Sequence, residues 1–126
     1  MRTIIWTTAV LLVVVVCSQA VTSYLARTAD ELSEQIVQVQ ALVEDSKWEM
    51  ARAEFRRTDN RWSEVGEVWA AVIRHQEIDE LEKSFARIQQ FLASEERGLA
   101  LAELEMAKLL LRHVPEKEKI RLHNIM

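Results

Sequence analysis

Residues 48–73 read WEMARAEFRRTDNRWSEVGEVWAAVI, and the rest of the chain is expected to pack around this stretch. Its four aromatic residues recur every seven positions, the spacing at which side chains line one stripe of a long helix. Large apolar residues at this spacing usually form a core, so we expect a structural core rather than a groove for a peptide, lipid or other hydrophobic ligand. The four residues are Trp48, Phe55, Trp62 and Trp69.

The composition of the whole chain favours an all-α fold. The 126 residues include only two Gly and one Pro, on which the turns of β-proteins depend. Apolar residues make up 49% of the chain and charged residues 29%, a balance typical of a helical protein. The net charge of −4 argues against a nucleic-acid partner, because nucleic-acid binders usually carry a positive excess.

The N-terminal segment predicts a membrane anchor, because residues 3–25 contain no charge. As a helix this segment would be roughly 34 Å long, enough to cross a hydrocarbon core of about 30 Å. We therefore expect a transmembrane signal anchor over residues 1–25 and an extracytoplasmic helical domain over residues 26–126. A cleaved signal peptide is the alternative, since residues 18–20 (Ser-Gln-Ala) resemble a cleavage site. Arg2 precedes the span, which favours a cytoplasmic N-terminus and a C-terminal domain outside the membrane.

The rest of the chain predicts an antiparallel bundle of about four helices. Thr28 and Glu31 match a capping box that would begin the first helix, although no helix-breaking residue separates it from the span. Asp45 or Ser46 is expected to cap the second helix, and Pro115 is expected to end the fourth. The expected helices cover residues 29–44, 47–74, 77–93 and 95–113.

The second expected helix also carries clustered arginines and a glycine. Acidic residues lie three positions from three of the arginines, which predicts a solvated, self-paired face rather than a surface for lipid headgroups or an acidic partner. Gly66 costs about 1 kcal/mol relative to alanine inside a helix, so we expect it to let another helix approach closely. The charged residues are Arg52, Arg56, Arg57 and Arg61, with Glu49, Glu54 and Glu64.

A shift of 49 residues superposes the first two expected helices on the last two without a gap. Leu32 then falls on Leu81, and Trp62 falls on Leu111. One interpretation is a duplicated helical hairpin. The other is that 49 is seven heptads, so that any heptad pattern matches itself at this shift. The matched positions are apolar and share no polar signature, which favours the second interpretation.

Two polar clusters are the candidate metal or ligand sites. His75, Glu77 and Asp79 follow the aromatic helix, and His113 and Glu118 follow the last one. In an antiparallel bundle both clusters lie at one pole, where imidazoles and carboxylates could share a metal ion. A polar knot that caps helix ends explains the same residues without a metal and is the favoured interpretation. The sequence contains neither HExxH nor the ExxH of di-iron bundles, and no cofactor is predicted.

The sequence offers no motif for covalent catalysis. It lacks GxSxG and a Gly-rich phosphate loop, and its single cysteine, Cys17, lies in the apolar N-terminal segment. We therefore expect a non-enzymatic structural or protein-interaction module at the outer face of the membrane, held there by residues 3–25, with an unknown protein partner. The alternative is a metal- or small-ligand-binding module that uses the polar clusters around His75 and His113.

These residues together resemble a small bacterial family called domain of unknown function 4363. The resemblance covers essentially the whole chain, and it implies a short membrane-associated helical protein of Gram-positive bacteria without an assigned activity. Family members commonly show two acidic residues around the first His motif, whereas this chain has Gln76 at one of them, which weakens a ligand role there. The resemblance is carried by the apolar span, residues 45–51 (DSKWEMA), Trp62, residues 75–79 (HQEID), residues 113–119 (HVPEKEK) and residues 122–125 (LHNI).

Overall fold

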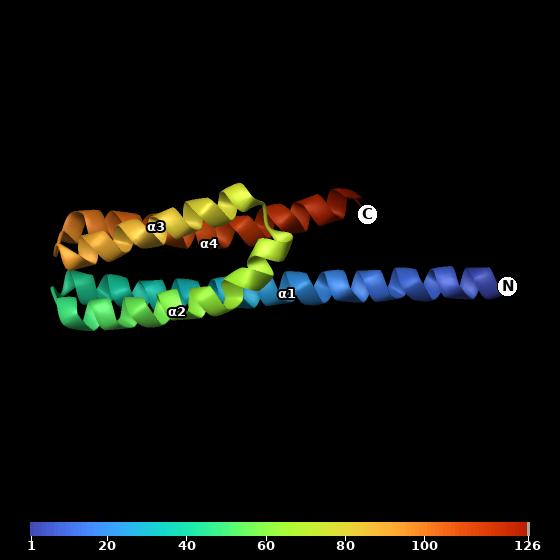
Figure 1. Ribbon diagram of the computed structural model, residues 1–126, viewed down its shortest axis with the longest axis horizontal. Coiled ribbons are helices and arrows are strands. Elements are labelled where there is room, and N and C mark those ends of the chain that lie inside the picture. Colours follow the sequence, from blue (N-terminus) through green and yellow to red (C-terminus); the bar gives the residue numbers. More distant parts are fainter. Residues whose placement is uncertain (126) are drawn as a thin grey trace.

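The computed structural model is an antiparallel bundle of four helices (Figure 1). It describes the backbone of residues 1–125 and the side chains of residues 1–114 and 116, and this part of the chain contains no strand. Each helix packs on its neighbours in the chain, and the last helix packs back on the first. The predicted all-α bundle is thereby confirmed. The helices are α1 (Arg2–Glu44), α2 (Trp48–Val72), α3 (His75–Ala93) and α4 (Arg97–Ile125).

Helix α1 runs from the apolar N-terminal segment into the bundle without a break (Figure 1). Almost all of its first 20 residues are exposed, and continuous burial in the bundle begins at Val21 and Leu25. This helix is long and apolar enough to cross a membrane. The absence of Gly and Pro from residues 2–44 explains its continuity.

The expected capping box at Thr28 is wrong, because Thr28 lies inside α1. Its hydroxyl donates to the carbonyl oxygen of Tyr24 at 2.8 Å, a bond typical of threonine inside a helix. The same oxygen accepts a hydrogen bond from the buried indole Nε1–H of Trp69 at 2.9 Å. The contact therefore satisfies both polar groups and ties α2 to α1 close to the point where α1 enters the bundle.

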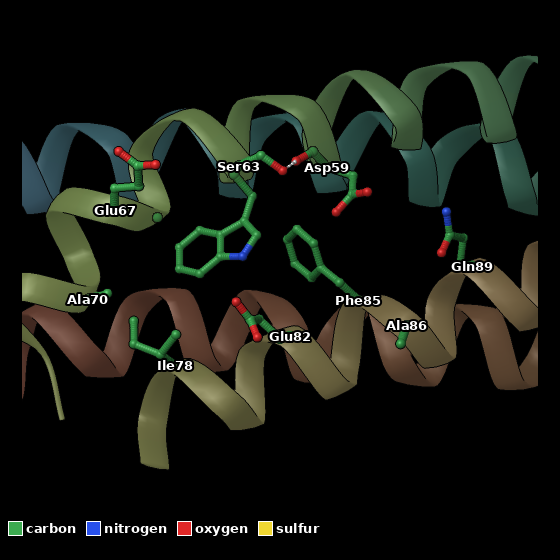
Figure 2. A pocket seen from close by; sticks show the side chains of 11 residues that line it. Asp59, Ser63, Glu67, Ala70, Ile78, Glu82, Phe85, Ala86 and Gln89 are labelled. Atoms are coloured by element: carbon green, nitrogen blue, oxygen red, sulfur yellow. Dashed lines mark hydrogen bonds between the residues drawn. The ribbon is translucent and has the colours of Figure 1, made fainter. Parts of the chain in front are cut away.

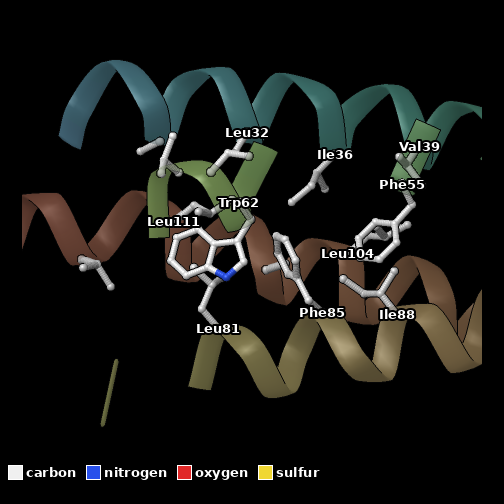
Figure 3. Packing of buried hydrophobic residues seen from close by; sticks show 14 of the residues in the cluster. Leu32, Ile36, Val39, Phe55, Trp62, Leu81, Phe85, Ile88, Leu104 and Leu111 are labelled. Carbon is white, nitrogen blue, oxygen red and sulfur yellow. The ribbon is translucent and has the colours of Figure 1, made fainter. Parts of the chain in front are cut away.

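The core lies along the bundle axis and takes one apolar stripe from each helix (Figure 3). Phe55, Trp62 and Trp69 are buried on α2, and Trp48 is partly buried at its start. Trp62 meets Trp69 edge to face at a centroid distance of 5.4 Å and meets Phe85 of α3 at 6.1 Å. Phe85 in turn meets Phe55 at 5.4 Å, so edge-to-face contacts join α2 to α3.

Several expected helix ends differ from the observed ones. Helix α2 begins after Lys47 without a side-chain cap, because Ser46 adopts a left-handed conformation with φ of 57° instead of capping the helix. The expectation that Pro115 ends the last helix is wrong, since α4 continues to Ile125. Proline removes one helical hydrogen bond, and a helix whose stripe stays buried through Leu111 and Val114 can tolerate that loss.

The two turns at the far end of the bundle have the same backbone structure. Ser46 and Glu95, 49 residues apart, have φ values of 57° and 55°. The N–H of Lys47 donates to Leu42 O at 2.9 Å, and at the shifted positions Glu96 donates to Phe91 O at 3.0 Å. A heptad pattern alone does not require matching left-handed turns at residues other than glycine. The sequence alone favoured a chance match between heptad patterns. The structure instead favours a duplicated helical hairpin.

Replacement of Trp69 by alanine tests the contact between α1 and α2. We expect Trp69→Ala to lower the free energy of unfolding by about 3–5 kcal/mol, because it leaves a cavity in the core and removes the donor to Thr28. The measurement is urea unfolding of the full chain in detergent, followed by circular dichroism. Val68→Ala is the matched control, because Val68 is 41% exposed on the same turn. A cost for Trp69→Ala no larger than that of the control would contradict this packing.

Candidate functional site

The two predicted polar clusters do not form a metal site among the described residues. His75 begins α3 and His113 lies on α4, and both side chains are exposed. The start of α3 and the C-terminal half of α4 lie at one end of the bundle, as the antiparallel arrangement implied (Figure 1). In the described part of the chain, however, no three His, Cys, Asp or Glu residues are grouped to hold an ion. Glu77 and Asp79 are half-buried, and the side chain of Glu118 lies outside the described residues.

A groove lies between α2 and α3, and we call it the α2–α3 groove (Figure 2). Its main cavity has a volume of about 510 Å³, and α2 and α3 are the most loosely packed of the neighbouring helix pairs. Trp62 and Phe85 contribute aromatic surface at its base. Three carboxylates line it, from Asp59 and Glu67 on α2 and from Glu82 on α3. Ser63, Gly66, Ala70, Ile78, Ala86 and Gln89 complete the lining.

A second cavity of about 340 Å³ continues the groove toward the turn between α3 and α4. Gln89 lines both cavities, whereas Arg52 and Arg56 line only the second. Arg52 is held in place, because its Nη1 donates to Leu92 O at 3.0 Å and lies 3.5 Å from a carboxylate oxygen of Glu95. The groove therefore has an acidic end toward the α2–α3 connection and a basic end toward the opposite turn.

The duplicated hairpins differ at the interface that forms the groove. The 49-residue shift relates the α2–α3 interface to the α1–α4 interface, which is closely packed. Glu82 of the groove corresponds to Ser33, which is small and 5% exposed between the helices. Asp59 corresponds to Lys108, which pairs with Glu105 at 2.9 Å. Two carboxylates thus stand where the other interface has a buried serine and a paired lysine, and the α2–α3 interface is also the more loosely packed of the two.

Gln40 at the α1–α4 interface and Gln89 at the α2–α3 interface are equivalent residues, but of the two only Gln40 links two helices in the described part of the chain. At the α1–α4 interface Gln40 Nε2 donates to Glu105 at 2.9 Å and links the helices. This bond and the ion pair with Lys108 lower the pKa of Glu105, with the Lys108 bond the larger cause. The corresponding residues at the other interface are Gln89 and Arg56, which line the groove.

Gly66 borders the groove, and the expectation that it admits another helix is wrong. A Cβ atom at this position would have its nearest contacts with the indole of Trp62, one turn earlier on the same helix, at 3.5 and 3.6 Å. These are ordinary van der Waals distances. The missing side chain therefore leaves space beside the Trp62 ring instead of permitting a close helix crossing.

The carboxylates of the groove carry charge without a matching cation. Burial raises the pKa of Asp59 above its ordinary value, because the charged form loses water. Among the described residues, Asp59, Glu67 and Glu82 form no ion pair with an arginine, lysine or histidine. The hydroxyl of Ser63 donates to the backbone carbonyl of Asp59 at 3.1 Å (Figure 2). The groove is therefore an electronegative surface over an aromatic base.

The arginines on the outer face of α2 are largely paired. Arg61 donates to Glu31 of α1 at 2.8 Å and to Glu64 at 2.9 Å, and these bonds raise the pKa of its guanidinium. Arg57 lies 3.8 Å from Glu54. The expected helical pairs thus form for these two residues, and Arg61 also links α2 to α1.

From the sequence, the aromatic stripe could form a ligand groove or a buried core; the core was favoured, and the carboxylates that line the groove were not predicted. Trp62, at 5% exposed, is both core and groove lining. The useful signal is a change of polar residue type between positions that the 49-residue shift relates. The two interfaces differ where Ser33 corresponds to Glu82 and where Lys108 corresponds to Asp59.

Removal of the Asp59 charge should stabilise the protein at neutral pH. The folded-state pKa lies above the unfolded value near 3.8, so the burial penalty is fully present above the folded pKa. It fades as the pH falls between the two values and is absent below both. We therefore expect Asp59→Asn to be more stable than wild type at pH 7, with the difference vanishing in acid.

The measurement is chemical unfolding of both proteins from about pH 8 to about pH 3, a range that spans carboxylate titration. The matched control is Asp45→Asn, because Asp45 is an exposed aspartate in the α1–α2 turn. A constant stability difference between wild type and Asp59→Asn across this range would refute the burial penalty.

Comparison with known proteins gives a family but no relative of established activity. No curated protein matches the chain, and no solved structure matches it. A family model without an assigned function matches residues 19–125. The matched region starts just before the packed part of α1 and includes α2, α3 and α4. The chain therefore belongs to the family described as Domain of unknown function (DUF4363).

Proposed function

We propose that this protein is a membrane-anchored, non-enzymatic module that binds another protein at the outer face of the membrane. Residues 3–25 form the signal anchor, the N-terminus lies in the cytoplasm, and the helical domain is extracytoplasmic. The observation that carries the proposal is the dual character of α1, whose first half is apolar and exposed and whose second half is bundle core.

The exposed half of α1 supports the anchor. Ile4, Trp6 and Leu11 are 64–71% exposed, and no other helix covers this segment of continuous apolar surface. Monomeric proteins in water rarely leave so large an apolar surface uncovered. A hydrocarbon core of about 30 Å would cover it, and the internal hydrogen bonds of the helix would satisfy its backbone.

The α2–α3 groove supports the interaction role. It is open to solvent and combines apolar surface with carboxylates that form no ion pair within the described part of the chain, which is the composition of a recognition surface. The Ser63 hydroxyl in the groove donates to a backbone carbonyl, so it is not activated as a nucleophile by a neighbouring base. Because α1 is continuous, a partner held in the groove would keep a defined position relative to the anchor.

An arginine in the middle of the apolar segment tests the anchor. We expect the wild-type chain to remain in membranes after carbonate extraction, with an uncleaved N-terminus by mass spectrometry and a helical domain open to protease added outside the cell. Leu12→Arg should release a large share of the protein from membranes, because arginine at the centre of a span costs about 2.5–3.5 kcal/mol.

Leu99→Arg is the matched control, because Leu99 is 50% exposed on α4, outside the apolar segment. It should stay in the membrane fraction. Wild-type protein in the soluble fraction, or a mature N-terminus near Val21, would contradict the anchor.

A further inference from the structure

We propose that the α2–α3 groove binds an extended or helical peptide segment of a partner protein, with Lys or Arg side chains placed at the acidic end. This inference rests on the proposed interaction function and specifies its surface and the chemistry of its partner. The acidic end is defined by Asp59, Glu67 and Glu82, and the basic end by Arg52 and Arg56.

The shape of the groove favours a peptide over a small molecule. The two cavities meet at Gln89 and follow α2 from Arg52 to Ala70, a helical distance of roughly 27 Å. An amphipathic segment laid between two helices is a common mode of peptide recognition, with apolar anchors at helical spacing. The apolar base at Trp62 and Phe85 gives such anchors a surface to contact.

The charges of the groove favour a basic segment at this end. Asp59 is half-buried with its carboxylate partly desolvated, and the described residues supply no cation to it. Part of the desolvation cost of this carboxylate is therefore already present before binding. A Lys or Arg side chain from a partner would add a charge-assisted hydrogen bond there, and Glu67 and Glu82 lie on the two helices that flank the site.

The indole of Trp62 offers a second point of recognition. Its side chain is 5% exposed and lines the groove, yet none of the described residues accepts a hydrogen bond from its Nε1–H. The Nε1 atom itself is not fully buried, so its N–H is accessible from the groove and open to an acceptor. A carbonyl oxygen of a bound peptide would supply one, whereas a simple ammonium ion has no acceptor to offer.

The basic end of the groove fixes the direction of the segment. Arg52 is already engaged by Glu95, so of the two arginines that line this end Arg56, which is exposed, is the one available to a ligand. A segment with basic residues near Asp59 and Glu67 and an acidic residue near Arg56 matches both ends. The reverse orientation would place like charges together at both ends.

Peptide titration tests the groove directly. The probe is a short, fluorescently labelled helical peptide of Lys, Leu and Ala, added to the full chain in phosphatidylcholine nanodiscs, with empty nanodiscs as the blank. We expect saturable binding that weakens with salt and a shift in tryptophan emission. The paired variant Glu67→Gln with Glu82→Gln should bind about tenfold more weakly, the loss expected from two partly exposed charge contacts.

The matched control is Glu34→Gln with Glu44→Gln, which removes two exposed carboxylates of α1 outside the groove. It should bind like wild type, and circular dichroism should show both paired variants folded. Equal loss in the control would assign binding to net charge and overturn the proposal. Equal binding of a Glu, Leu and Ala peptide would also overturn it. Complete displacement of the peptide by tetramethylammonium would overturn the proposal too, because it would identify the occupant as a small cation.

A photo-crosslinking experiment in membranes separates this inference from the proposed function. Benzoylphenylalanine is placed at Gln89 in the groove or at Glu34 on α1, and crosslinked products are compared with and without the Glu67→Gln, Glu82→Gln pair. A partner crosslinked from Gln89, and lost in the paired variant, is the expected result. A partner crosslinked only from Glu34 leaves the interaction function standing and overturns the groove. No crosslinked partner from either position overturns the interaction function itself.

Discussion

The structure depends on the continuity of α1. One helix supplies both the apolar N-terminal segment and a quarter of the bundle core, so no flexible joint separates the two. The contact between Trp69 and Thr28 lies near the start of the packed region and joins α2 to this helix. The link between Arg61 and Glu31 follows about one turn further along α1. The orientation of the bundle is thus set by α1 and held by α2.

The duplicated hairpin explains both the regularity of the bundle and its main irregularity. Matching turns at Ser46 and Glu95 direct each second helix back along the first. The core positions repeat as well. At the α1–α4 interface the helices pack closely, and Ser33 is buried between them. At the equivalent α2–α3 interface Glu82 and Asp59 line the groove instead. The two interfaces thus differ at a few polar positions within a repeated framework, while the core positions are kept.

The sequence predicted the repeating parts of this fold well. The seven-residue spacing of the aromatic residues located α2, and similar stripes located the other helices, because burial of one face determines helix position. The ends were less predictable. Thr28 looks like a cap in the sequence, and only its tertiary contact with Trp69 shows why it lies inside a helix. Ser46 gave no sign of a left-handed turn, since glycine is the usual residue there.

The site could not be predicted from local patterns. A groove depends on the separation of two helices, and that separation depends on pairs of residues far apart in the sequence. The His clusters attracted attention because of their ligand types, but ligand type does not determine whether side chains converge. In the described residues His75 and His113 stay exposed without forming a metal-binding group, whereas carboxylates from α2 and α3 line the groove that also contains Trp62.

The most direct test of the account is a distance across the junction in α1. Spin labels are placed by Val16→Cys and Glu34→Cys in a Cys17→Ser background, and the full chain is studied in nanodiscs by double electron–electron resonance. Both positions are exposed and lie on the same face of α1. An unbroken helix predicts a narrow distribution centred on a backbone separation of about 27 Å. A broad distribution, or a much shorter mean distance, would show a joint in α1 and contradict a rigidly attached bundle.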